Sequence, residues 1–140
     1  MEGLKHIERL IASYIARNYQ NVAEVGVGNN PLVAEMLAER GLSVFCTDIR
    51  YPAADCRVRF VIDDIYSPCH LLYGGLDLIY AIRPTEEMIG PLIRLARTVN
   101  CDLLVYHLGF EGCGMQGEII DCGVVLRLYN RRQNPSKRVF

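Results

Sequence analysis

The sequence predicts a three-layer α/β domain with a mostly parallel sheet of five to six strands. Short runs rich in Val, Ile and Leu recur along the chain, as in strands that are buried on both faces. Segments with apolar residues at helical spacing separate several of these runs. The chain has 140 residues, of which 51% are apolar and 22% charged, and this suits one globular domain. Because crossovers between parallel strands are right-handed almost without exception, we expect a Rossmann-like architecture.

The first half of the chain is predicted to run helix, strand, helix, strand, strand. Pro31 suits the first position of the second helix, because its missing backbone N–H would be unpaired there in any residue. Gly41 suits the end of that helix. The expected ranges are 5–19, 22–27, 31–40, 43–47 and 58–62.

The second half is predicted to contain three more strands and one main helix. Pro91 removes a backbone donor, so the helical signal after Thr85 should divide into a short turn and a longer helix. The expected ranges are strand 76–82, turn 86–89, helix 91–99, strand 102–106, a glycine-rich loop at 109–117 and a last strand at 124–129.

Residues 1–130 should form the single domain, and residues 131–140 a disordered basic tail. The formal net charge of −1 hides an asymmetry, because the segment from Gly123 to Phe140 has five basic residues and no acid. The rest of the chain is acidic and would repel a nucleic-acid backbone. Contact with nucleic acid is therefore expected only through the tail, whose simpler interpretation is a solvated terminus.

The composition also indicates the cellular location. The N-terminus mixes both signs of charge, unlike a signal peptide, and no apolar stretch approaches the ~20 residues that would cross a bilayer. The six cysteines include no CxxC pair, so we expect free thiols, neither a zinc nor a redox site, and no bound metal. These features predict a cytoplasmic protein.

A glycine turn follows the first predicted strand. Gly26 and Gly28 would let the backbone turn tightly and let a ligand approach, and the next helix would offer unpaired N–H groups to an anion. The dinucleotide fingerprint GxGxxG would need a third glycine where Pro31 stands. The alternative is an ordinary strand-to-helix turn.

Acidic residues end the next two predicted strands. Asp48 lies twenty residues beyond Gly28, the spacing of the acid that binds ribose hydroxyls in nucleotide-binding βαβ units. Asp63 and Asp64 follow the third strand, and one of them could accept a hydrogen bond from the exocyclic amine of adenine. The alternatives are that Asp48 starts a turn and that Asp64 caps a helical turn.

These residues resemble class I S-adenosylmethionine-dependent methyltransferases. The segment from Glu24 to Asn30, Glu-Val-Gly-Val-Gly-Asn-Asn, is similar to the E/DxGxGxG motif of that superfamily. Asp48 and Asp63 or Asp64 fall where the superfamily places its ribose and adenine contacts. More narrowly, the chain resembles a small archaeal family of uncharacterised proteins with this fold over residues 5–130, in the segments 24–28, 47–49, 63–68 and 78–84.

The resemblance implies that Glu24 orients the glycine loop or binds the amino-acid part of S-adenosylmethionine. Asn30 replaces the third glycine of the motif and would crowd that part of the cofactor or hydrogen-bond to it. Arg83 stands where many amino-group methyltransferases have an Asn/Asp-Pro-Pro-Tyr/Phe motif. A cation there suits a carboxylate or phosphate rather than an amine, and its alternative partner is a surface acid.

The leading hypothesis is a domain that binds S-adenosylmethionine or a related adenine nucleoside and transfers a methyl group to an acceptor that the sequence leaves unidentified. The first alternative is a non-catalytic sensor of NAD or another adenine nucleotide. The second is a degenerate fold used for protein interaction. His70 and His107 are candidate bases, and the segment Gly109–Gly117 is either a lid or a plain surface loop.

Overall fold

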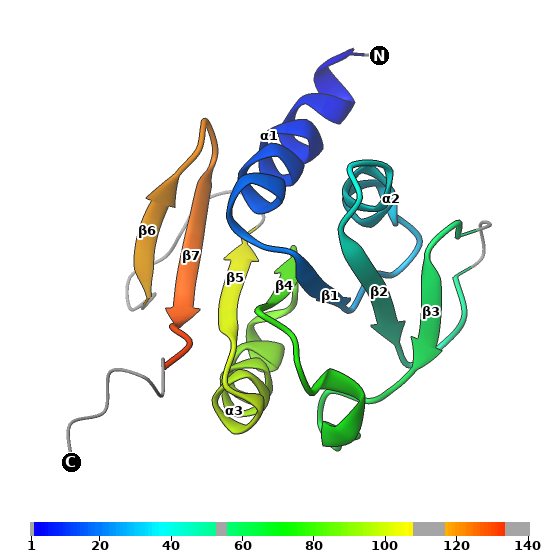
Figure 1. Cartoon of the computed structure of the whole chain (residues 1–140), viewed down its shortest axis with the longest axis vertical. Helices are drawn as coiled ribbons and strands as arrows, with labels where there is room; N and C mark the ends of the chain where they lie inside the picture. The colour runs from blue at the N-terminus through cyan, green and yellow to red at the C-terminus, as the bar shows by residue number, and fades with distance from the viewer. Residues whose placement is uncertain (1, 53–55, 108–116, 134–140) are drawn as a thin grey trace.

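The computed structural model describes residues 2–52, 56–107 and 117–133. They form one seven-stranded sheet with helices on both faces (Figure 1). The helices are α1 (Glu2–Asn18), α2 (Leu32–Glu39) and α3 (Ile89–Val99), with two 3₁₀ turns, η1 (His70–Tyr73) and η2 (Glu86–Met88). The strands are β1 (Asn21–Val25), β2 (Ser43–Asp48), β3 (Arg59–Ile62), β4 (Leu78–Ile82), β5 (Asp102–Tyr106), β6 (Glu118–Asp121) and β7 (Val125–Asn130).

The strand order is β3-β2-β1-β4-β5-β7-β6. The first five strands are all parallel, whereas β7 runs antiparallel to β5 and β6 antiparallel to β7. Parallel strands bring their carboxyl ends to one edge of a sheet, so the residues that follow β1 to β5 share one side of the molecule. The order changes direction between β1 and β4, because β2 and β3 extend to one side and β4 and β5 to the other.

Two apolar cores sandwich the sheet. One face is covered by α1 and α2, whose Ile11, Ile15 and Leu37 are buried against side chains of β1, β4, β5 and β7. The other face is covered by α3, whose Leu92 and Leu95 pack with residues from the opposite side of the same strands. Burial on both faces explains why the central strands are almost continuously apolar.

The predicted architecture is confirmed, with one correction. The sheet has seven strands rather than five to six, because Glu118–Asp121 forms an edge strand that pairs with β7. Most of its side chains are exposed, so it lacks the apolar run that marks a central strand. Between β3 and β4 the described chain forms the 3₁₀ turn η1.

The start of the predicted tail is attached to the sheet. Arg131 pairs with Glu118, and the Arg132 N–H donates to the Asp102 carboxylate at 2.6 Å. Residues 134–140 and most of the predicted loop at 109–117 lie outside the described residues. Within the described part of the chain, every helix is too short or too polar to cross a membrane.

Candidate functional site

A hollow opens at the carboxyl ends of β1, β2 and β3; we call it the carboxyl-edge hollow. It contains about 370 Å³ of empty space, including the part open to solvent. Its walls come from the three strand ends, the segment after β3 and the turn η2. They are Val25, Gly26, Thr47, Asp48, Ile49, Asp63, Asp64, Ile65, Tyr66 and Met88.

The turn after β1 forms one wall of this hollow. The N–H groups of Gly26 and Val27 donate to the Thr47 carbonyl at 2.9 and 3.2 Å, which ties the turn to β2. Gly26 has a φ of +74°, a left-handed conformation that side chains other than glycine rarely adopt. A Cβ added there would lie 3.0 Å from Met88 Cε. Glycine is therefore required both by the backbone and by the close approach of Met88.

Asp48 connects the end of β2 to the glycine turn. Its Oδ2 accepts the Gly28 N–H at 2.8 Å, and its Oδ1 accepts the N–H of Ile49 at 2.6 Å. Each carboxylate oxygen can accept a second hydrogen bond. The carboxylate is thus held in place by two backbone donors and is still able to accept from a ligand's hydroxyl groups.

The adjacent acids Asp63 and Asp64 have different environments. Asp63 accepts hydrogen bonds from the Tyr73 hydroxyl at 2.6 Å and from the Cys69 N–H at 3.1 Å, so both of its oxygens hold the segment after β3. Burial, together with the bond to Asp63, raises the pKa of Tyr73. Asp64 is exposed, and among the described residues its carboxylate accepts only the Tyr66 N–H, through Oδ1 at 2.9 Å. Its Oδ2 is the oxygen of this pair that is available to a ligand.

Apolar side chains flank the carboxylates of the hollow. Ile49 is 58% exposed and Tyr66 is 57% exposed, although both are large hydrophobic residues. Exposed apolar groups beside polar groups are typical of a ligand-binding surface. Here they would provide contact for a flat, partly apolar ring.

The hollow is acidic. Three carboxylates line it, and its ten lining residues include no Lys, Arg or His. A focused negative potential favours cationic ligands and disfavours phosphate groups. The Gly28 N–H, in the turn before α2, is already bonded to Asp48.

Glu24 lies on the opposite face of the sheet from the hollow. It neighbours Cys46 and Tyr80 in register and is only 2% exposed. Burial raises the pKa of Glu24 to about 8, and the nearby Tyr80 hydroxyl partly opposes this shift. Within the described residues, Glu24 Oε1 and the Tyr80 hydroxyl have no hydrogen-bond partner. Glu24 is therefore placed beneath the glycine turn rather than against a ligand in the hollow.

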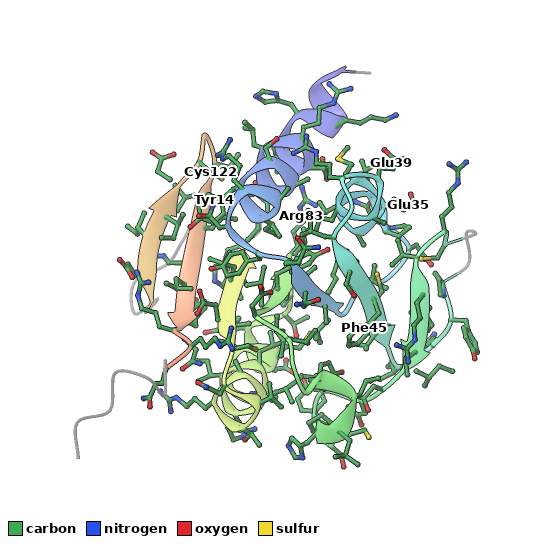
Figure 2. The ribbon with its side chains drawn as sticks, in the orientation of Figure 1. Tyr14, Glu35, Glu39, Phe45, Arg83 and Cys122 are labelled. Atoms are coloured by element: carbon green, nitrogen blue, oxygen red, sulfur yellow. The ribbon has the colours of Figure 1, made fainter. Side chains whose placement is uncertain are left out.

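Arg83 also lies apart from the hollow. Its Nη1 is 3.6 Å from Oε2 of the buried Glu8 on α1, and its guanidinium lies 5.2 Å from the centre of the Tyr106 ring. In Figure 2, Arg83 lies beside α1. Arg83 has a φ of +53°, so the backbone turns sharply after β4. The sequence suggested Glu86, Glu87 or another surface acid as the alternative partner of Arg83, whereas the acid beside its side chain is the buried Glu8 of the N-terminal helix.

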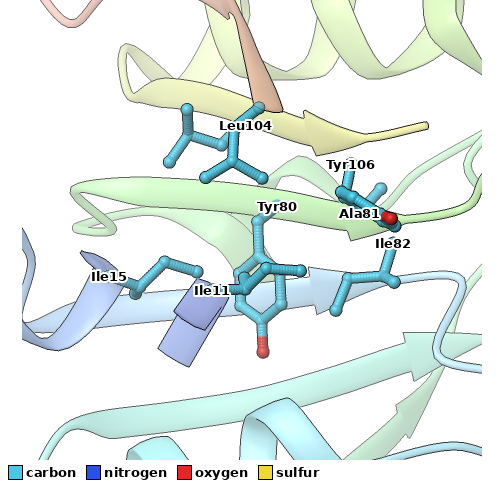
Figure 3. A pocket seen from close by; sticks show the side chains of 8 residues that line it. Ile11, Ile15, Tyr80, Ala81, Ile82, Leu104 and Tyr106 are labelled. Carbon is cyan, nitrogen blue, oxygen red and sulfur yellow. The ribbon is translucent and has the colours of Figure 1, made fainter. Parts of the chain in front are cut away.

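Beneath α1, next to this ion pair, lies a smaller pocket with about 170 Å³ of empty space, including the part open to solvent (Figure 3). The side chains of Ile11, Ile15 and Tyr80 form part of its wall, and Leu104 and Tyr106 on β5 form another part. This cavity is almost wholly apolar and lies within the core. The ends of β4 and β5 are thus covered, whereas the ends of β1 to β3 are open.

The remaining predicted residues lie outside the hollow. The Asn30 side-chain oxygen accepts the Leu32 N–H at 3.3 Å, which helps to start α2. His107 Nε2 lies 2.7 Å from the Tyr129 hydroxyl. His70 lines a second hollow against α3. Within the described part of the chain, the His, Cys, Asp and Glu side chains form no group that could hold a metal ion.

Sequence reasoning did not name as site residues six of the ten lining residues, which are Val25, Thr47, Ile49, Ile65, Tyr66 and Met88. Ile49 directly follows Asp48, and Tyr66 lies two positions after Asp64, so their position after the strand ends was a usable signal. Met88 is contributed by a turn sixty residues after the glycine motif, and no local pattern marks it.

Solved structures similar to this chain include several methyltransferases. The CcbJ methyltransferase from Streptomyces caelestis aligns with a TM-score of 0.56 at 21% identity, over 70% of this chain and 50% of its own. Magnesium protoporphyrin IX methyltransferase from Synechocystis PCC 6803, solved with bound SAM, aligns with a TM-score of 0.53 at 19% identity, over 74% of this chain. This chain spans 58% of that second protein. At these identities the similarity shows a shared fold.

Sequence comparison places the chain in a family. A protein of Archaeoglobus fulgidus, described as a UPF0146 protein, is 38% identical over 125 residues, which cover 89% of this chain and 95% of the relative. The model of the same family matches residues 7–125. The chain therefore belongs to the uncharacterised protein family UPF0146, and its fold is that of class I S-adenosylmethionine-dependent methyltransferases.

Proposed function

We propose that the carboxyl-edge hollow binds S-adenosylmethionine or a closely related adenine nucleoside. The observation that carries this proposal is the convergence of the glycine turn at Gly26 with Asp48 and Asp64 around one open space. The methyltransferase fold supports it, because ligands of open α/β sheets bind outside the carboxyl ends of the strands.

Each part of the ligand would have a counterpart in the hollow. Asp48 would accept hydrogen bonds from the ribose hydroxyls, since two backbone donors already orient its carboxylate. Asp64 would accept from the adenine amine through its unbonded oxygen. Ile49 and Tyr66 would contact the base. Gly26 and Met88, which both line the hollow, would contact the rest of the ligand.

The charge of the hollow favours S-adenosylmethionine over a dinucleotide. S-adenosylmethionine has a cationic sulfonium and no phosphate, whereas NAD has two phosphates that would meet three carboxylates. Bound S-adenosylmethionine would supply a methyl group, and its transfer depends mainly on alignment with an acceptor. The residues named here would hold and orient the nucleoside.

Calorimetric titration tests the proposal. We expect S-adenosylmethionine or S-adenosylhomocysteine to bind, and NAD to bind at least about tenfold more weakly, which corresponds to about 1.4 kcal/mol. Asp48→Asn should weaken nucleoside binding by a similar factor, because the amide replaces an acceptor with a donor.

Asp121→Asn is the matched control, since Asp121 also accepts the N–H of a glycine, Gly123, but on the β6–β7 turn. It should leave binding unchanged. Tighter binding of NAD than of either nucleoside would support the sensor hypothesis instead. Failure of all three ligands to bind would leave interaction with another protein as the better hypothesis.

A further inference from the structure

A second hollow lies between the segment after β3 and the helix α3; we call it the α3 hollow. It contains about 670 Å³ of empty space, including the part open to solvent, and is larger than the carboxyl-edge hollow. The two hollows share the walls Ile65 and Tyr66 but have no other lining residue in common.

The floor of the α3 hollow is apolar and rigid. Ile65 is 7% exposed and Leu95 is 1% exposed, and both belong to the core between α3 and the sheet. Pro91 is buried beside them in the first turn of α3. A small apolar group entering the hollow would therefore rest on a surface already held in place by the fold.

The rim of the α3 hollow is cationic. Arg94 and His70 both line it and are both exposed, together with the hydroxyl-bearing residues Ser67 and Thr98. Within the described residues, the Arg94 guanidinium makes no hydrogen bond or ion pair. Its Nη1 lies 3.5 Å from the position of a Cβ at Gly90, so the side chain folds back over the first turn of α3.

Among the described residues, no carboxylate lines this hollow. The acids nearest to its walls in the chain, Asp63, Asp64, Glu86, Glu87 and Asp102, are not among its lining residues. The first turn of α3 also contains no acidic residue, and the amino end of a helix carries a partial positive charge. The local field therefore favours an anion, in contrast to the carboxylate-lined hollow next to it.

We propose that the α3 hollow is a binding site for a small organic anion, with a phosphate or carboxylate group at Arg94 and an apolar body on Ile65, Leu95 and Pro91. The planar guanidinium can donate two parallel hydrogen bonds to such a group. His70 and Ser67 provide further polar contacts at the rim, whereas the Thr98 hydroxyl already donates to the Arg94 carbonyl at 2.8 Å. The site adjoins the proposed nucleoside site through the shared walls Ile65 and Tyr66, but its polar contacts come from other residues.

Phenyl phosphate and benzoate are suitable probes, because both combine an anionic group with a small apolar ring. Each is titrated into the labelled full-length protein while amide shifts are followed. We expect saturable shifts at Ser67, His70, Arg94 and Thr98 with millimolar affinity for at least one probe. Ile65 and Tyr66 are left out as reporters because they also line the carboxyl-edge hollow.

Arg94→Gln should weaken binding at least about tenfold, the loss expected when a hydrogen bond to a charged group is removed. Arg97→Gln is the matched control, because Arg97 is exposed on the same helix but does not line the hollow. Arg94-dependent binding of either probe supports the site and identifies its preferred acidic group. Equal affinities of the two variants, or no saturable shift with either probe, would overturn the proposal.

Discussion

The carboxyl edge of the sheet has two halves that differ in access and in charge. At β1 to β3 the strand ends surround an open hollow lined by three carboxylates. At β4 and β5 the helix α1 covers the strand ends, and Arg83 is paired there with the buried Glu8. Both halves contain acidic residues, but only in the first do they face open space.

The comparison separates two uses of a carboxylate. Asp48 and Asp64 have an oxygen able to accept another hydrogen bond at the open half. Glu8 and Glu24 are 4% and 2% exposed, and the unbonded oxygen of each is enclosed by protein. Substitutions of Asp48 and Asp64 should therefore change ligand binding, whereas those of Glu8 and Glu24 should change stability.

The largest loss of stability is expected for Gly26→Ala. The positive φ costs about 1–2 kcal/mol for a residue with a Cβ, and the contact with Met88 adds an overpacking cost of about 1–3 kcal/mol. Nucleoside binding should be lost as well. Gly41→Ala is the control, since Gly41 has a φ of +89° and open space around it. Urea unfolding should show the smaller loss for Gly41→Ala; equal losses would contradict the role assigned to Met88.

The next effect concerns the ion pair of the covered half. Arg83→Gln would leave the Glu8 carboxylate buried without its partner, so we expect stability to fall by about 1–3 kcal/mol, with nucleoside affinity unchanged. Arg59→Gln is the control, because Arg59 also lies over an aromatic ring, Phe45, but is exposed on β3. A clear loss of nucleoside affinity in Arg83→Gln would contradict the view that the covered half takes no part in nucleoside binding.

Glu24 should make stability depend on pH. Its pKa rises from the ordinary 4.5 to about 8 on folding, so the native protein retains a proton that the unfolded chain releases. Stability from this group is therefore greatest below pH 4.5 and falls as the pH rises toward 8, by up to about 1.4 kcal/mol per pH unit. Glu24→Gln should flatten this slope in unfolding experiments across the range. An unchanged slope would show that Glu24 is already ionised in the folded protein.

The smallest effect distinguishes two neighbouring acids. Asp64→Asn should weaken nucleoside binding about tenfold with little loss of stability, because Asp64 is exposed. Asp63→Asn should instead lower stability by about 1–2 kcal/mol, since Asp63 holds both Tyr73 and Cys69. Calorimetry and urea unfolding on the same two variants measure both quantities. The reverse pattern would assign the ligand contact to Asp63.

Local sequence was sufficient to predict the elements that position Gly26 and Asp48. The strand, the glycine turn and the start of α2 follow from residues within ten positions of one another. The end of β2 at Asp48 follows from an apolar run. The hydrogen bond between Asp48 and Gly28 links residues twenty positions apart, which is the spacing of one βα unit.

The covered half depended on contacts between distant segments, and local sequence did not predict it. Arg83 and Glu8 are seventy-five positions apart, and their approach requires α1 to pack across the ends of β4 and β5. Asp63 rather than Asp64 accepts hydrogen bonds from Tyr73 and Cys69, and this difference depends on where the fold places those two residues. The edge strand β6 was missed because its exposed residues lack an apolar pattern.

Mapping amide shifts during titration with S-adenosylmethionine tests the central claim most directly. The account predicts saturable shifts at Gly26 and Gly28, at Asp48 and Ile49, and at Asp64, with the amides of Arg83 and Tyr106 unchanged. Shifts confined to the ends of β4 and β5, or no shifts at saturating ligand, would contradict it.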